Sequence, residues 1–100
     1  MEISKKIAWS KRALKQFENI YRYIFENSEQ NAEKVRKEIL DEIAKASKYP
    51  ESYSPEMYKT NNDGSYRYFE KHRLRVTYRV MEDSIRIVRV RHSSMRPKLI

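Results

Sequence analysis

The sequence predicts an α+β domain with the element order β-α-α-β-β-β, in which a helical hairpin packs on one face of a twisted antiparallel sheet. In the first half of the chain, apolar residues recur at helical spacing in two consecutive segments. After Gly64 they alternate with polar residues, as in strands. The chain has 100 residues, of which one is Gly and three are Pro. This length and composition predict one ordered domain over residues 1–100.

The first expected element is a strand over residues 2–9 with one buried face. Its apolar positions are Ile3, Ile7 and Trp9. Ser10 is expected to be the N-cap of a helix, because its hydroxyl can accept a hydrogen bond from a free amide of the first turn. The helix is expected from Lys11 to about Asn27. Its apolar stripe comprises Ala13, Leu14, Phe17, Ile20, Tyr21 and Ile24.

A second helix is expected to start at Ser28 and to end near Lys48, because Pro50 disfavours helical geometry at Tyr49. Its apolar stripe comprises Ala32, Val35, Ile39, Ile43 and Ala46. Only residues 27–30 separate the two stripes. The two helices are therefore expected to turn back on each other as an antiparallel hairpin.

Residues 50–64 contain two Pro and end in Asn61-Asn62-Asp63-Gly64. They are expected to form a connector with its own turn. The strand that follows alternates from Tyr66 onward, and the sequence leaves the face of Arg67 undetermined.

The next strand alternates most clearly. The residues expected to face the helices are Leu74, Val76, Tyr78 and Val80. The opposite, open face is expected to carry Arg73, Arg75 and Arg79. After a tight turn at Glu82 and Asp83, a last strand is expected from Ser84 to His92. It carries apolar residues on both faces, which predicts a central place in the sheet.

The formal charge of +8 is concentrated near the C-terminus. Residues 65–100 hold ten Lys or Arg against three acids, whereas residues 1–64 hold twelve against eleven. Arginine favours bidentate recognition of phosphate or carboxylate. This third of the chain is therefore expected to meet nucleic acid or an acidic protein surface, rather than only to keep the protein soluble. The candidate binding residues are Arg73, Arg75, Arg79, Arg89, Arg91 and Arg96.

Several function classes are excluded on composition. The chain lacks Cys, and no stretch approaches the roughly 18 apolar residues of a membrane span. No signal peptide is evident, so a cytoplasmic location is expected. His72 and His92 are twenty residues apart without a carboxylate at ligand spacing, so no metal site is expected. No cofactor is expected either, because a single Gly excludes a glycine-rich phosphate loop.

An acid–base site or a binding surface remains. Metal-free RNA cleavage needs a base, an acid and a cation for the phosphorane charge. His92 is the candidate for proton transfer, and Arg67, Arg75 and Arg96 are candidates for the cation. The alternative for His92 is a structural histidine at the end of a strand.

Four segments of the chain resemble the RelE/ParE family of bacterial toxin–antitoxin modules. They are the opening WSKRALKQFENIYRYI, the strand segments Arg75-Val76-Thr77-Tyr78-Arg79-Val80 and Ile85-Arg86-Ile87-Val88-Arg89-Val90-Arg91-His92, and the final Arg96-Pro97. The resemblance implies a helical hairpin on a twisted sheet. It also implies a small acidic, ParD-like antitoxin that silences the toxin, and this antitoxin is expected in the adjacent reading frame. RelE-like members cleave mRNA in the ribosome, whereas ParE-like members are associated with poisoning DNA gyrase.

The match to the RelE-like branch is incomplete. Arg75 matches the Arg of the RelE third-strand pattern, and Arg67 sits where RelE-like enzymes begin a pair of lysines. Phe69 occupies the place of the second lysine and cannot stabilise an anion. No Tyr follows Pro97, so the usual C-terminal aromatic group is missing.

The ending Val90-Arg91-His92 with Arg96-Pro97 looks more like the ParE branch. We therefore favour a gyrase-binding toxin without chemistry of its own over a metal-independent, ribosome-dependent mRNA endonuclease. A non-toxic nucleic-acid-binding module is the third hypothesis. Three aromatic residues of the first helix are candidate antitoxin contacts, although each could equally belong to the core: Tyr21, Tyr23 and Phe25.

Overall fold

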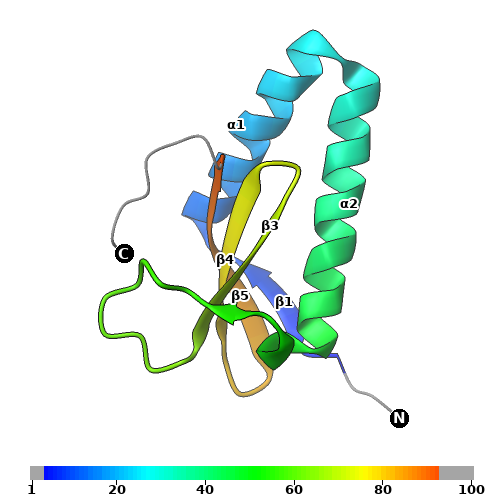
Figure 1. Ribbon diagram of the computed structural model, residues 1–100. Coiled ribbons are helices and arrows are strands. Elements are labelled where there is room, and N and C mark those ends of the chain that lie inside the picture. Colours follow the sequence, from blue (N-terminus) through cyan, green and yellow to red (C-terminus); the bar gives the residue numbers. More distant parts are fainter. Residues whose placement is uncertain (1–3, 93–100) are drawn as a thin grey trace.

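The structure is a computed structural model that describes residues 4–92. Its helices are α1 (Lys11–Asn27) and α2 (Glu29–Lys48), followed by the short 3-10 helix η1 (Pro50–Ser52). Its strands are β1 (Lys6–Trp9), β2 (Ser54–Pro55), β3 (Tyr66–Lys71), β4 (Leu74–Val80) and β5 (Ser84–His92). Figure 1 shows the hairpin of α1 and α2 beside the sheet. The predicted fold class and element order are confirmed.

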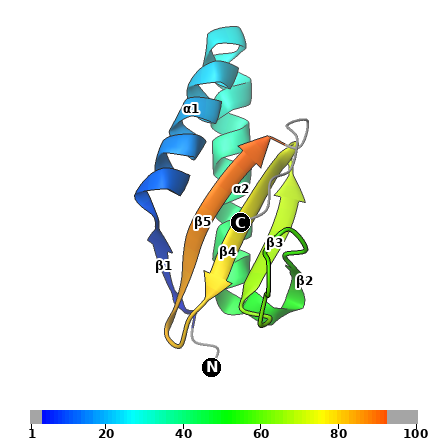
Figure 2. The same cartoon turned by 90° about the vertical axis from the view of Figure 1, so that its left-hand side faces the viewer.

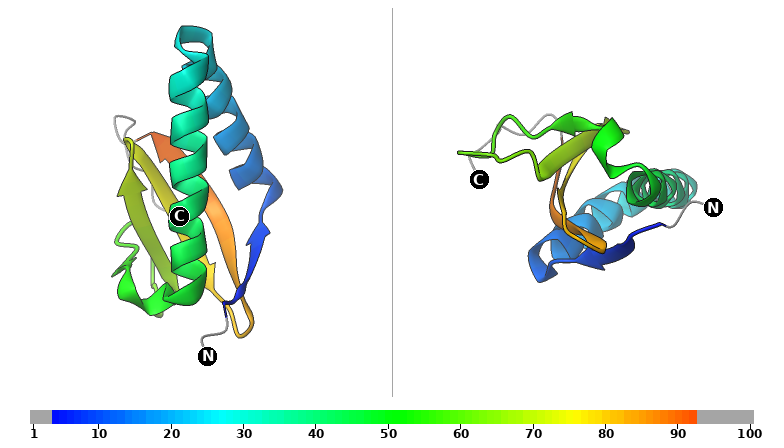
Figure 3. Two further views of the ribbon diagram at one scale, coloured as in Figure 1. Left: turned by 90° about the vertical axis from the view of Figure 1, so that its right-hand side faces the viewer. Right: turned by 90° about the horizontal axis from the view of Figure 1, so that it is seen from below.

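The five strands form one sheet in the order β1-β5-β4-β3-β2. β1 pairs parallel with β5, and every other pair is antiparallel, so the sheet is mixed. Both helices cover the same face of the sheet, and the tip of their hairpin projects beyond its end (Figures 2 and 3). The opposite face, which bears no helix, is called the open face below.

Serine caps set the bounds of the two helices, as the sequence predicts. The Ser10 hydroxyl accepts a hydrogen bond from the Ala13 N–H at 3.0 Å, and the Ser28 hydroxyl accepts one from the Asn31 N–H at 3.1 Å. Ser28 also ends α1: its N–H makes the last helical hydrogen bond, to the Ile24 carbonyl, and its own backbone is extended, with φ −161° and ψ 109°. One residue therefore makes the whole turn between the helices.

The core lies between the hairpin and the sheet. Ile39 and Ile43 of α2 are almost fully buried. Of the four β4 residues predicted to face the helices, Leu74, Val76 and Tyr78 are fully buried, and Val80 is partly buried against the same core. Ile85, Ile87 and Val90 of β5 complete the sheet side of the core. The buried Tyr78 hydroxyl donates to the Pro50 carbonyl at 2.7 Å, which fixes the end of α2 against β4.

β5 lies inside the sheet, between β1 and β4, as its sequence pattern predicts. Thr77 pairs with Arg89 while Tyr78 pairs with Ile87, so Val88 is an extra residue in β5. This bulge lets Ile87 and Val90 face the helices together, although they are three residues apart. Ile85, Ile87 and Val90 belong to the core, whereas Val88 interrupts the regular alternation.

Two local expectations also need correction. Residues 50–64 contain η1 and the edge strand β2, which pairs with β3, rather than only a turn. Arg73 is not in β4: it forms the turn with His72, and both have a positive φ, of 64° and 52°. Ile3, at the start of the first expected strand, lies outside the described residues.

Candidate binding face of the sheet

The order of the strands in the sheet is seen in Figure 2, and their register places the residues of the open face in rows across the strands. One row, here the Arg79–Arg86 row, comprises Ala8, Arg86, Arg79 and Tyr66. The next comprises Arg89, Thr77 and Tyr68, and the third, here the Arg75–Arg91 row, comprises Arg91, Arg75 and Glu70. The bulge at Val88 keeps all three β5 arginines on this face.

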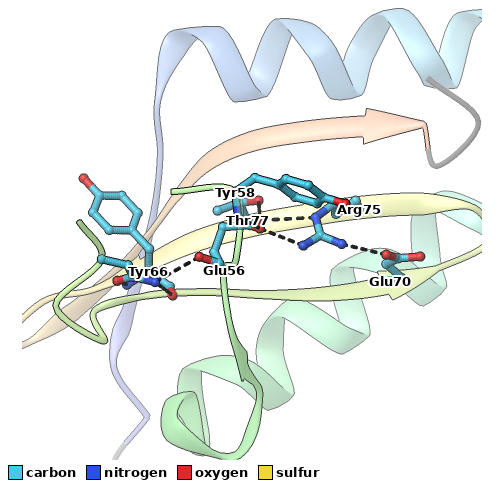
Figure 4. Close-up of polar contacts among 7 residues, drawn as sticks. Glu56, Tyr58, Tyr66, Glu70, Arg75 and Thr77 are labelled. Carbon is cyan, nitrogen blue, oxygen red and sulfur yellow. Dashed lines mark hydrogen bonds and ion pairs between the residues drawn. The ribbon is translucent and has the colours of Figure 1, made fainter. Parts of the chain in front are cut away.

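Glu56 lies over the Arg75–Arg91 row and is 2% exposed (Figure 4). Its carboxylate accepts hydrogen bonds from Arg75 Nη2 at 2.6 Å and Arg75 Nε at 3.2 Å. It also accepts from the Thr77 hydroxyl at 2.7 Å and from the Tyr58 N–H at 3.1 Å. Arg75 Nη1 donates to Glu70 at 2.7 Å, so two internal carboxylates neutralise this guanidinium.

Two aromatic rings, those of Tyr68 and Tyr58, pack against the Arg75 guanidinium. It stacks 3.6 Å from the centroid of Tyr68 and 4.8 Å from that of Tyr58. Burial alone would raise the pKa of Glu56, but the hydrogen bonds from Arg75, Thr77 and the Tyr58 N–H outweigh it and hold that pKa below its ordinary value. Glu56 therefore stays ionised at neutral pH.

The segment that carries Glu56, residues 56–64, lies over the open face and is called the strap (Figures 2 and 3). Asn62 fastens it. The Asn62 amide nitrogen donates to the carbonyls of Glu56 and Tyr66 at 3.1 and 2.8 Å. Its amide oxygen accepts from the N–H groups of Gly64 and Tyr66 at 2.9 and 3.2 Å. One side chain thus ties both ends of the strap to β3.

The Arg79–Arg86 row is built differently. The Arg79 guanidinium lies 5.1 Å from the centroid of Tyr66, and Lys59 Nζ of the strap lies 4.9 Å from the same centroid. Asp63 feels the charge of Arg79: its pKa is held below its ordinary value first by hydrogen bonds from Ser65 and then by that charge. The Asp63 carboxylate accepts hydrogen bonds from the Ser65 N–H at 2.9 Å and from the Ser65 hydroxyl at 2.6 Å.

The residues considered for RNA cleavage are not brought together in the part of the chain that the structure describes. Arg75 is on the open face. Arg67 pairs with Tyr78 and His92 pairs with Leu74, so both are placed on the face that bears the helices. Arg67 Nη1 donates to the carbonyls of Glu51 and Tyr53, at 3.2 and 2.6 Å. Arg96 lies outside the described residues.

Of the candidate binding arginines, four lie on the open face: Arg75, Arg79, Arg89 and Arg91. Arg89 is only 6% exposed, and Arg73 lies in the turn instead. Sequence reasoning did not single out Glu56 or Tyr66. Their partners are far away in sequence, and the one available signal was an acid inside a Pro-containing connector.

A second surface lies on the helical hairpin. A groove of about 350 Å³ is lined by Phe17, Glu18, Tyr21, Arg22, Phe25 and Arg36. The Tyr21 hydroxyl donates to Glu33 across the hairpin, and Phe25 is 42% exposed. Tyr23 is 68% exposed and does not line the groove. The alternative that these aromatics belong to the core is therefore wrong for Tyr23 and Phe25.

Two site classes find no support within residues 4–92. No three His, Asp or Glu side chains gather there as a metal site would require. Neither α1 nor α2 has the length and apolar character needed to cross a bilayer.

A family model matches most of the chain, and a solved structure shares its fold. The family model described as the ParE toxin of the type II toxin–antitoxin system parDE matches residues 7–97. The solved structure titled as a chromosomal ParDE toxin–antitoxin system from P. aeruginosa superposes with a TM-score of 0.67 at 16% sequence identity. The superposition covers 89% of this chain and 96% of that one. No curated protein matches the sequence.

Proposed function

Because the chain belongs to the ParE toxins of type II toxin–antitoxin systems, we propose that it acts in the cytoplasm by binding and inhibiting DNA gyrase. It does so without chemistry of its own. A cognate acidic antitoxin silences it by covering its cationic and apolar surfaces.

The observation that favours this proposal over RNA cleavage is that the Arg75 guanidinium is already paired with two carboxylates. In a metal-free ribonuclease, an arginine at this position must be available to the phosphorane. Here Glu56 and Glu70 already hold the guanidinium, and the side chain is only 14% exposed. A buried carboxylate beside the guanidinium would also repel the scissile phosphate.

His92 supports the same conclusion. A general acid or base must come within hydrogen-bond reach, about 3 Å, of the proton that it transfers. The register places His92 on the face opposite Arg75, so the two cannot flank one phosphate in this arrangement.

The gyrase proposal is tested with the free toxin and two readouts. We expect inhibition of gyrase supercoiling and no codon-specific cuts in polysomal mRNA. His92→Ala should keep full inhibition and full growth arrest, because His92 has no role in chemistry. A general acid–base residue would instead lose about 10²–10⁴-fold in rate on this change.

Three outcomes would contradict the proposal. They are normal supercoiling with the folded toxin, mRNA cuts within codons, and loss of toxicity in a His92→Ala protein that still folds. The last two would favour the ribosome-dependent endonuclease.

The hairpin groove supports an antitoxin with apolar anchors among acidic residues. Tyr21 and Phe25 offer apolar surface, while Arg22 and Arg36 place two cations at the same groove. Complementary charge would speed association, and burial of the aromatic rings would set the residence time.

Phe25→Ala is therefore expected to weaken antitoxin binding about tenfold, mainly through faster dissociation. The measurement is surface plasmon resonance with the acidic protein of the adjacent reading frame. Tyr23→Ala is the matched control, because it removes an exposed ring of the same helix outside the groove. Equal effects of the two variants would rule out the groove as the docking site.

A further inference from the structure

We propose that the Arg79–Arg86 row is a phosphate-binding site that contacts the backbone of DNA. The choice of DNA as the source of the phosphate rests on the proposed gyrase function, since gyrase acts on bound DNA. The site itself rests on the contacts of this row alone.

The first observation is a pair of like charges directly opposite each other. Arg79 of β4 pairs with Arg86 of β5 in the antiparallel ladder. Side chains at directly paired positions lie about 5 Å apart at Cβ, and like charges there destabilise the sheet. An anion bound between the two guanidinium groups removes that cost.

The second observation is that neither guanidinium has an acceptor within residues 4–92. Arg79 Nε is buried without a hydrogen-bond partner, and no carboxylate forms an ion pair with either arginine in that part of the chain. Leaving a buried donor unsatisfied is unfavourable, and a bound acceptor removes that cost. Arg79 is held in place by its contact with the Tyr66 ring instead, which leaves its outer N–H groups for a ligand.

At the other end of the open face, a second pair of opposite arginines is neutralised by carboxylates. Arg75 and Arg91 form a second like-charged pair, and there Glu56 and Glu70 supply the negative charge. Asp63, which feels the charge of Arg79, accepts hydrogen bonds from Ser65 instead of forming an ion pair with this row. This row therefore keeps an excess of positive charge.

The shape of the row fits a phosphodiester strand. Two guanidinium groups on neighbouring strands can each donate two N–H groups to one phosphate. Ala8, which pairs with Arg86 on β1, is small and exposed, so the β1 residue of this row leaves room for a duplex. At the other end Lys59, beside Tyr66, supplies a third cation for the next phosphate along the strand.

The test is fluorescence anisotropy of a labelled 20-base-pair DNA duplex with the free toxin, without gyrase, across a salt series. We expect Arg79→Gln/Arg86→Gln to weaken binding at least tenfold at 100 mM salt. The slope of log K against log salt should fall in magnitude by about two, one for each arginine that no longer neutralises a phosphate. Lys34→Gln/Lys37→Gln is the control, because it removes the same charge from exposed positions of α2 and should change neither value much.

Equal affinities of the wild type and the Arg79→Gln/Arg86→Gln protein would overturn the inference, and so would an equal loss in the control. Binding of an acidic peptide in preference to the duplex would also overturn it. The supercoiling assay on the wild type keeps the two proposals separate. Normal supercoiling defeats the gyrase function, whatever the duplex measurement gives, whereas inhibition without duplex binding defeats only the phosphate site.

Discussion

Replacing Glu56 with Ala is expected to lower the free energy of unfolding by about 3–5 kcal/mol. Glu56 is 2% exposed. Its loss removes the main acceptor of the half-buried Arg75 guanidinium and of the buried Thr77 hydroxyl. Removing one partner of a buried ion pair costs this much because the other charge stays desolvated. Urea unfolding followed by circular dichroism measures the change.

Glu70→Ala is the matched control, since Glu70 binds the same guanidinium from a side chain that is 48% exposed. It should cost at most about 1 kcal/mol. Glu56→Gln should fall between the two, because an amide keeps an acceptor but loses the charge. If Glu56→Ala is as mild as Glu70→Ala, then Glu56 does not hold the strap on the sheet.

The same residue gives a pH dependence with a definite sign. The pKa of Glu56 in the folded protein lies below its ordinary value of 4.5, so its contribution to stability is complete above about pH 5. That contribution is lost as the pH falls through the folded pKa. As the pH falls below about 5, the wild type should therefore lose stability more steeply than Glu56→Ala. Parallel curves for the two proteins would show that Glu56 is not held ionised by Arg75.

The features that depend on neighbours in sequence were predictable. Ser10 and Ser28 accept from N–H groups three residues ahead, so a local pattern is enough to place the helix ends. The alternation in β4 places Leu74, Val76 and Tyr78 in the core, because the side-chain period of a strand is fixed at two.

The features that depend on distant partners were not predictable. Glu56 meets Arg75 nineteen residues away, across a connector that looked like a turn. The bulge at Val88 exists only in relation to the register of β4, so the sequence of β5 alone did not reveal it. The face of Arg67 likewise follows from its pairing with Tyr78.

Asn62→Ala is expected to lower the free energy of unfolding by about 2–3 kcal/mol. Four hydrogen bonds disappear together, and they join the first residue of the strap to Gly64 and Tyr66 at its end. Each contributes roughly 0.5–1.5 kcal/mol, and water can replace part of them because Asn62 is half-buried. Thr60→Ala, an exposed change in the same strap, should stay within about 0.5 kcal/mol.

A double-mutant cycle then asks whether Asn62 and Glu56 hold one segment. Once Asn62 no longer ties the strap to β3, the strap can move away from Arg75, so less remains to be lost on removing Glu56. The double variant should therefore be more stable than the sum of the single effects predicts, by about 0.5–3 kcal/mol. Strict additivity would mean that Glu56 reaches Arg75 without help from Asn62. In that case the ion pair between Glu56 and Arg75 does not depend on the hydrogen bonds by which Asn62 fastens the strap to β3.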